Sequence, residues 1–216
     1  MAGHQSIYGR FGKRCLDIVL ASTALIVLSP LLLVLWLIGH VAIGRPVLFR
    51  QTRPGRDDVL FDLIKFRSMN NRRGQDGELL PDRVRMTAYG RFLRATSLDE
   101  LPELWNVLRG DMSLVGPRPL LERYLSRYTP EQRRRHQVLP GLTGWAQVHG
   151  RNMASWADRF SYDIWYIDHV SLGLDLRIIA MTIVYVIRRV GIHSAESETV
   201  PEFMGEAQPH SAKADS

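Results

Sequence analysis

Two adjacent carboxylates, Asp99 and Glu100, lie in the segment 97–104, which reads SLDELPEL. Neighbouring acids favour a hard cation with oxygen ligands such as Mg²⁺, and an aspartate carboxylate can act as a nucleophile. A structural explanation competes with this one, because Ser97 followed three residues later by Glu100 has the spacing of a helix capping box. The spacing alone fits the cap better than it fits a catalytic pair.

Two further segments place cations where a phosphate could bind. Arg118 lies between two prolines in the sequence GPRP, and the restricted backbone of proline holds such an arginine in a preset position suited to a phosphate. Lys65 and Arg67 follow an apolar segment, where they could bind phosphates or lipid headgroups. The structural alternatives are a rigid loop with a surface arginine and an exposed strand end.

Several common catalytic motifs are absent from the 216 residues, among them G-x-G-x-x-G, G-x-x-x-x-G-K-[ST], H-E-x-x-H, G-x-S-x-G and D-x-D. The single cysteine, Cys15, excludes an internal disulfide framework and a cysteine-based zinc site. The length fits one domain with an appended element.

The net charge of +6 conceals an uneven distribution. Residues 1–56 carry +6 and residues 57–190 carry +4, whereas residues 191–216 carry −4. Of the 28 basic residues 25 are arginines, the type suited to bidentate phosphate contacts and headgroup anchoring. A genome rich in G and C, which favours arginine codons, explains the same bias equally well.

Residues 18–38 form an uncharged apolar run of 21 residues, which is long enough to be embedded in a membrane. Ser29 and Pro30 lie near its centre, and proline kinks or breaks a helix. Each of the two arms, about 18 and 21 Å long at 1.5 Å per residue, is too short to cross about 30 Å of hydrocarbon. Basic residues on both sides suit a hairpin that enters and leaves on the cytoplasmic face. A kinked transmembrane helix fits these physical arguments equally well.

The rest of the chain predicts a mixed, mostly helical domain. Residues 59–69 have the composition of a strand, and Leu101, Leu104, Trp105 and Leu108 have helical spacing. The uncharged core of a further helix, residues 178–187, is too short to span a membrane and is therefore buried or interfacial. The predicted helices cover 91–108, a segment starting at Thr129-Pro130, 155–168 and 174–190. Loops are predicted over 70–81 and 110–119, and a loop or short strand over 140–152.

Five segments occur in an order that resembles the bacterial sugar transferase family, the monotopic phosphoglycosyl transferases that act on polyprenol phosphate. They are KRCLDIVLAS…LSPLLL, GRPVLFRQTRPGRD, FDLIKFRSM, TSLDELPELWNVLRGDMSLVGPRP and PGLTGWAQVHGRN. The resemblance covers about residues 11–190, and it implies an α+β, mostly helical fold. Its parts are a re-entrant membrane helix hairpin over 11–44, broken at Ser29-Pro30, and a cytoplasmic catalytic domain over 45–190 with amphipathic interfacial helices and short strands. Residues 191–216 are expected to form a disordered tail.

The resemblance also implies an activity, the transfer of a sugar-1-phosphate from a UDP-sugar to undecaprenyl phosphate with release of UMP. This reaction would initiate surface-glycan synthesis at the cytoplasmic face of the bacterial inner membrane. By analogy, Asp99 is the catalytic nucleophile that forms a covalent intermediate, and Glu100 and Asp99 bind Mg²⁺. Lys65, Arg118 and Asp163 match substrate-binding positions, with Arg118 expected at the phosphate.

The alternative is a membrane-anchored scaffold protein that binds anionic lipid or another polyanion without catalysis. Basic charge is compatible with such a role. However, Asp99 and Glu100 would repel a polyanion in the absence of metal. We therefore expect membrane lipid, and no nucleic acid, as a partner.

Overall fold

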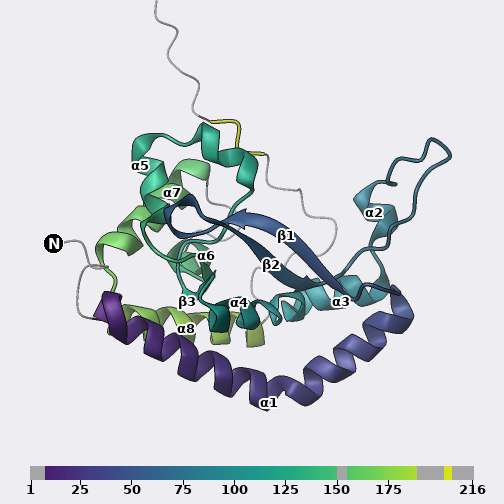
Figure 1. The fold of residues 1–216 in the computed structure, drawn as a ribbon, viewed down its shortest axis with the longest axis horizontal. Coiled ribbons are helices and arrows are strands. Elements are labelled where there is room, and N and C mark those ends of the chain that lie inside the picture. The colour runs from purple at the N-terminus through teal and green to yellow at the C-terminus, as the bar shows by residue number, and fades with distance from the viewer. Residues whose placement is uncertain (1–7, 150–154, 189–201, 206–216) are drawn as a thin grey trace, which may run out of the picture.

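The computed structural model describes residues 8–149, 155–188 and 202–205 (Figure 1). Helices dominate, and the strands of the described residues form two small two-stranded sheets. The predicted α+β, mostly helical class is therefore confirmed. The helices and the larger sheet surround a core that lies against the long N-terminal helix α1, Lys13–Ala42.

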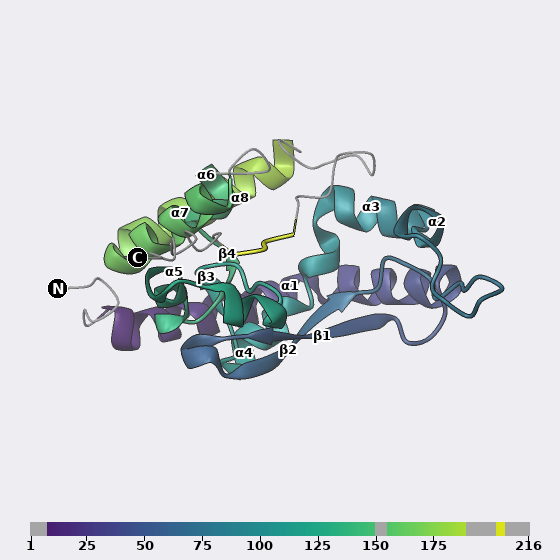
Figure 2. The same ribbon diagram turned by 90° about the horizontal axis from the view of Figure 1, so that it is seen from above.

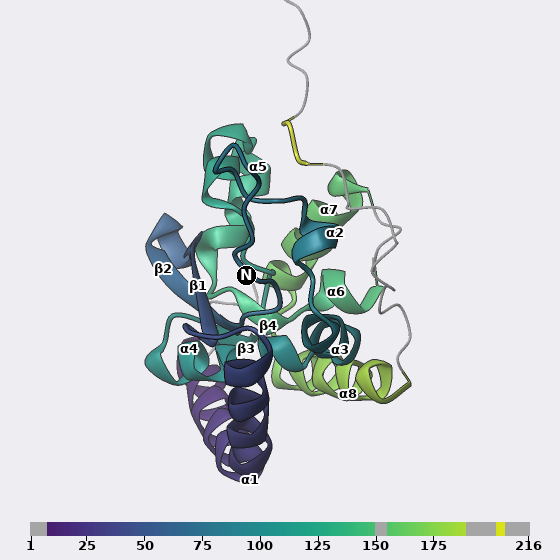
Figure 3. The same cartoon turned by 90° about the vertical axis from the view of Figure 1, so that its right-hand side faces the viewer.

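Helix α1 is continuous through Pro30 and bends near its middle (Figures 1 and 3). Proline has no N–H to donate to the carbonyl of Ile26 one turn earlier. The Ser29 Oγ donates to that carbonyl over 2.8 Å instead. The convex side of the bend faces away from the domain, and both ends turn toward it (Figure 1). The predicted break at Ser29-Pro30 thus takes the form of a bend within one helix.

More than half of the residues of α1 are exposed in the part of the chain that the structure describes. Its buried residues are Asp17, Ala21, Leu35 and Gly39. Among the described residues α1 is the one helix long and apolar enough to cross a membrane. Its exposed large hydrophobic residues are Ile18, Val19, Ile26, Val27, Leu31, Leu33, Val34, Trp36, Leu37, Ile38 and Val41.

An antiparallel hairpin, β1 (Leu48–Pro54) and β2 (Leu60–Phe66), follows α1. The short helical turn η3, Arg56–Asp58, connects the two strands. Leu63, Ile64 and Phe66 of β2 are buried, so this strand forms part of the core, as the apolar sequence of residues 59–69 predicts. Lys65 lies among them, opposite Phe49 of β1.

The predicted helix over 91–108 is in fact two helices, α3 (Ala88–Thr96) and α4 (Glu103–Arg109). Ser97 ends α3 with a left-handed backbone, φ 55°, and its side chain makes no capping hydrogen bond. The capping-box interpretation of Ser97 and Glu100 is therefore wrong. Asp99 and Glu100 instead lie in a short helical turn, η4 (Leu98–Glu100), between the two helices.

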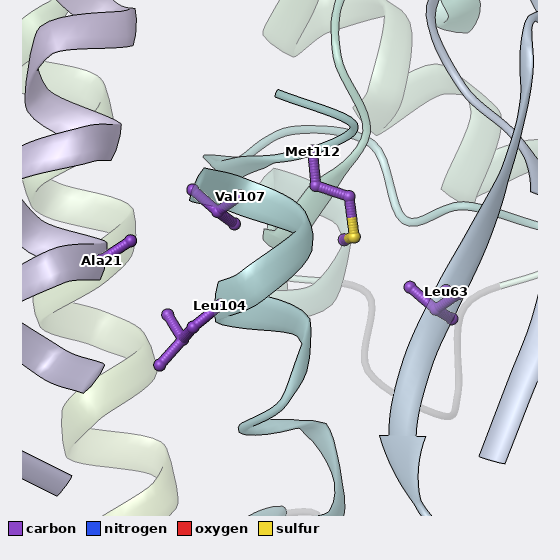
Figure 4. Close-up of a cluster of buried hydrophobic side chains, with 5 residues drawn as sticks. All are labelled: Ala21, Leu63, Leu104, Val107 and Met112. Atoms are coloured by element: carbon purple, nitrogen blue, oxygen red, sulfur yellow. The ribbon is translucent and has the colours of Figure 1, made fainter. Parts of the chain in front are cut away.

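Helix α4 is the centre of the core. Its residues Leu104 and Val107 lie between Ala21 of α1 on one side and Leu63 of β2 on the other, together with Met112 (Figure 4). Because α4 contacts both elements, the loop that precedes it is fixed relative to α1 and to β2.

The second sheet pairs β3 (Ser113–Val115) with β4 (Gly141–Thr143) in parallel. The two backbones approach so closely that a Cβ on Gly141 would lie 2.1 Å from the backbone nitrogen of Gly116. Asp17 connects this sheet to α1, because its Oδ1 accepts hydrogen bonds from the Ser113 Oγ and the Leu114 N–H.

The remaining elements of the described residues are helices and short helical turns. The predicted cap at Thr129 is confirmed as a full capping box, but the helix after it is only four residues long. Residues 145–149, predicted as loop or strand, form a helix. The elements are α2 (Asp82–Arg85), η5 (Glu122–Arg127), α5 (Pro130–Arg133), η6 (Arg134–Gln137), α6 (Trp145–His149), α7 (Trp156–Asp168) and α8 (Leu172–Arg188).

Helix α8 lies on the same side of the molecule as α1 (Figure 3). Asp175 of α8 is buried and accepts hydrogen bonds from Tyr8 and Lys13, which holds the start of α1 against α8. The second half of α8 leaves Ile183 and Ile187 exposed. Figure 2 shows α7 and α8 together along one edge of the domain.

Of the expected tail over 191–216, the structure describes only Glu202–Gly205, where Phe203 is buried against the domain. The other residues of the tail lie outside the described residues.

Candidate active site

Four charged side chains from different elements meet beside α4. Lys65 Nζ of β2 lies 2.8 Å from Oε1 of Glu100 in η4 and 3.0 Å from Oε1 of Glu103 in α4. Arg118, in the loop after β3, donates through Nη2 to the same Oε1 of Glu100 at 2.5 Å. The structure thus brings together three of the residues predicted from the sequence, Lys65, Glu100 and Arg118.

Asn106 of α4 fixes the position of β2 relative to the site. It accepts a hydrogen bond from the Ile64 N–H at 3.0 Å and donates to the Asp62 carbonyl at 2.8 Å. The side chain is fully buried. Since Ile64 precedes Lys65 and Asn106 lies one turn after Glu103, this amide sets the distance between the lysine and its carboxylate partners.

Arg135 and Asp163 support the loop that carries Arg118. Arg135 of η6 donates to the Arg118 carbonyl over 2.7 Å and forms a buried ion pair with Asp163 of α7 at 2.8 Å. Arg135 and Asp163 are both nearly inaccessible to solvent. Asp163 therefore pairs with Arg135 and positions it, and Arg135 in turn contacts the Arg118 loop.

Glu103 belongs to the site although the sequence analysis did not assign it there. Its side chain is buried, and burial together with the negative charge of Glu100 raises its pKa to about 7, against the opposing influence of Lys65 and Arg118. The available signal was its position three residues after Glu100, about one helical turn along the chain.

Of the two glutamates, Glu100 is the one that is ionised. Burial tends to raise its pKa, but the charges of Arg118 and Lys65 and the hydrogen bonds from both outweigh burial and hold the pKa well below its ordinary value. The negative charge of Glu100 correspondingly raises the pKa of Arg118 despite burial. Glu100 and Arg118 therefore face each other as full charges.

Asp99 lies next to this network without joining it. Its carboxylate accepts no hydrogen bond from the part of the chain that the structure describes, and the residue is half-buried. Burial and the negative charge of Glu100 raise the pKa of Asp99, while Lys65, Arg94 and Arg118 lower it. A carboxylate that is close to cations and free of hydrogen bonds is available to attack an electrophile.

The arrangement fits a magnesium ion that is shared with a substrate. Both cationic contacts of Glu100 go to Oε1, which leaves Oε2 for a metal. Among the described residues no three acids, histidines or cysteines converge on one point. Mg²⁺ is commonly held by one or two carboxylates, with water and substrate phosphates completing its shell, and Asp99 and Glu100 match that requirement.

The chain is similar to known proteins over most of its length. Residues 8–189 match the family model described as bacterial sugar transferase. The chain is 48% identical over 193 residues to the uncharacterized sugar transferase EpsL of Bacillus subtilis, covering 89% of this chain and 96% of that one.

Two relatives carry more specific names. The chain is 44% identical to the UDP-glucose:undecaprenyl-phosphate glucose-1-phosphate transferase of Caulobacter vibrioides, over 79% of this chain and 68% of that one. It is 40% identical to the undecaprenyl-phosphate galactose phosphotransferase of Salmonella typhimurium, over 85% of this chain. The chain spans only 42% of the length of the Salmonella protein.

Proposed function

Because the chain belongs to the bacterial sugar transferase family, we propose that it moves a sugar-1-phosphate from a UDP-sugar to undecaprenyl phosphate and releases UMP. The names of the relatives from Caulobacter and Salmonella support the lipid acceptor. The observation that carries the proposal is the position of Asp99 beside Glu100, Lys65 and Arg118. A scaffold protein without catalysis would not need this arrangement of charges.

The proposed reaction has two steps at one phosphorus atom. In the first, an oxygen of the Asp99 carboxylate bonds to the sugar-bearing phosphorus of the donor, and the bond from that phosphorus to the bridging oxygen breaks, so that UMP leaves. In the second, a phosphate oxygen of undecaprenyl phosphate bonds to the same phosphorus. The bond to Asp99 breaks, which regenerates the carboxylate and leaves a lipid-linked diphosphate sugar.

Lys65 and Arg118 lower the electrostatic cost of both steps. Carboxylate, donor and acceptor are all anionic, so their approach is opposed by charge repulsion. Fixed cations at the transferring phosphoryl group offset that repulsion. Asp99 and Glu100 would hold Mg²⁺, which supplies Lewis-acid neutralisation of the pyrophosphate when it is bound.

The bent helix α1 supports a location at the cytoplasmic face of the inner membrane. Its exposed apolar residues suit lipid, and its two ends, both flanked by basic residues, turn toward the same domain. α4 packs directly on α1, so the proposed site lies close to the headgroups that carry the acceptor phosphate.

The products of the reaction test this proposal. The full chain in detergent is incubated with undecaprenyl phosphate, Mg²⁺ and each of a panel of UDP-sugars, and the released nucleotide is identified. We expect UMP from one or a few donors. Release of UDP would identify an ordinary glycosyl transfer and contradict the proposal.

A further inference from the structure

The segment Glu202–Gly205 lies on the side of the domain opposite α1 (Figures 1 and 3). Its Phe203 is enclosed by aromatic side chains, which together form an aromatic pocket. The Phe203 side chain is 4% exposed. Its ring stacks on Tyr128 with centroids 5.8 Å apart and meets the edge of Phe160 at 5.0 Å. Tyr124 and Trp156 complete the enclosure, at 5.7 and 5.5 Å.

Polar contacts fix the backbone and the charge of the same segment. The Phe203 N–H donates to the Tyr124 hydroxyl, and the Phe203 carbonyl accepts from Arg127. The carboxylate of Glu202 lies 2.9 Å from Arg123 and 2.8 Å from Arg127. An enclosed aromatic ring, a paired acid and a bonded backbone are the features by which proteins recognise short peptides.

The pocket is connected to the candidate active site through Arg135. The Arg135 guanidinium lies over the rings of Tyr128 and Phe160, with 5.9 and 5.8 Å to their centroids. The rings of these two residues also contact Phe203. The same guanidinium donates to the Arg118 carbonyl. Phe203 therefore packs against both rings that hold the Arg135 guanidinium. Arg135 in turn supports the loop that carries Arg118.

We propose that this pocket is a docking site for a Glu-Phe peptide, that the chain's own residues 202–205 occupy it, and that their docking holds Arg118 in its working position. Docking of the peptide is independent of the proposed function, whereas the effect on turnover rests on it. Phe203 and Glu202 act as positioning residues, since neither contacts Asp99, Glu100 or Lys65 among the contacts of the described residues.

Peptide binding to the full chain tests the docking site without any substrate. A fluorescent peptide of residues 198–207 is titrated into the wild-type chain and into the full-length double variant Glu202→Ala/Phe203→Ala. We expect the variant, whose pocket is vacated, to bind the peptide at least about tenfold more tightly than the wild type, because the wild-type segment competes at a high effective concentration. Equal binding to both proteins would overturn the proposal.

Two altered peptides provide the matched control. The Met204 side chain is 74% exposed, so a peptide with Met204→Ala should bind the double variant as the natural sequence does. A peptide with Phe203→Ala should bind about thirtyfold more weakly, the size of loss expected for a buried aromatic anchor. Indistinguishable binding of these two peptides would contradict recognition of Phe203.

The coupling to Arg118 is tested by rescue. We expect the double variant to show a raised KM for the UDP-sugar with a smaller change in kcat, and addition of the natural peptide to restore the KM. Peptide that binds without restoring the KM would overturn the coupling. A wild-type chain without any turnover would instead contradict the proposed function.

Discussion

The Lys65 Nζ lies 3.0 Å from Oε1 of Glu103, whose side chain is only 3% exposed. The same ammonium group lies 2.8 Å from Glu100. One lysine is therefore paired with two carboxylates. The negative charge of the first carboxylate disfavours ionisation of the second. Arg118 neutralises Glu100 in addition, so Glu103 is the acid that retains its proton up to a pKa of about 7.

Glu103→Gln should remove a pH dependence of stability. Between the ordinary pKa of 4.5 and the raised value of about 7, the folded chain keeps the Glu103 proton and the unfolded chain does not. The free energy of unfolding of the wild type therefore falls as pH rises through this interval. The Tm of Glu103→Gln, measured in detergent with EDTA, should exceed that of the wild type by roughly 5 °C above this range and match it at the acidic end.

Glu78→Gln is the control, because Glu78 is exposed. Its Tm should follow the wild type at every pH. A Glu103→Gln profile parallel to the wild-type profile would show that Glu103 is ionised throughout.

Asn106→Ala should destabilise the protein and the site together. The substitution leaves the Ile64 N–H and the Asp62 carbonyl without their side-chain partner in a buried position. The loss should be about 2–3 kcal/mol in the free energy of unfolding, measured by denaturant titration in detergent. Asn71→Ala, at an exposed position, should change it by less than about 0.5 kcal/mol. Equal losses for the two variants would show that Asn106 does not hold β2 against α4.

Arg118→Lys should lower kcat/KM for the UDP-sugar about a hundredfold although the positive charge is retained. Lysine lacks the planar group that can bond to Glu100 and a phosphate at the same time. Steady-state kinetics measure the effect. Arg109→Lys, a change on an exposed arginine of α4, should leave kcat/KM close to the wild-type value. An Arg118→Lys enzyme with wild-type kinetics would show that charge alone suffices.

The bend at Pro30 predicts that both ends of α1 lie on one side of the membrane. Single cysteines in place of Gln5 and Arg56, introduced into a Cys15→Ser background, should react with an impermeant maleimide from the same face in oriented vesicles. Labelling from opposite faces would identify α1 as a spanning helix.

Much of this site could be predicted when the residue types were combined with the family resemblance, whereas spacing alone favoured a helix cap formed by Ser97 and Glu100. Lys65, Glu100 and Arg118 are indeed brought together. The structural role of Ser97, which ends α3, could not be predicted from spacing, because its left-handed backbone depends on how α3 and α4 pack. Whether Asp163 contacts substrate or positions another residue depends equally on tertiary contacts, and here it pairs with Arg135.

Two other features were hidden by local composition. Glu103 has the sequence context of a surface acid in the first turn of a helix, and only the approach of β2 buries it beside Lys65. Phe203 is a single aromatic residue in an acidic, polar segment, and its pocket is formed by residues 43 to 79 positions earlier in the chain. Such distant partners leave no periodic signal in the sequence.

The most direct measurement of the central claim is the mass of the intact protein after incubation with a reactive UDP-sugar and Mg²⁺ in the absence of undecaprenyl phosphate. The wild-type chain should gain the mass of one sugar phosphate on the peptide that contains Asp99, with release of about one UMP per enzyme. Asp99→Asn should gain nothing. An unmodified wild-type chain that still turns over with the lipid acceptor, or an Asp99→Asn variant with normal turnover, would contradict the assignment of Asp99 as the nucleophile.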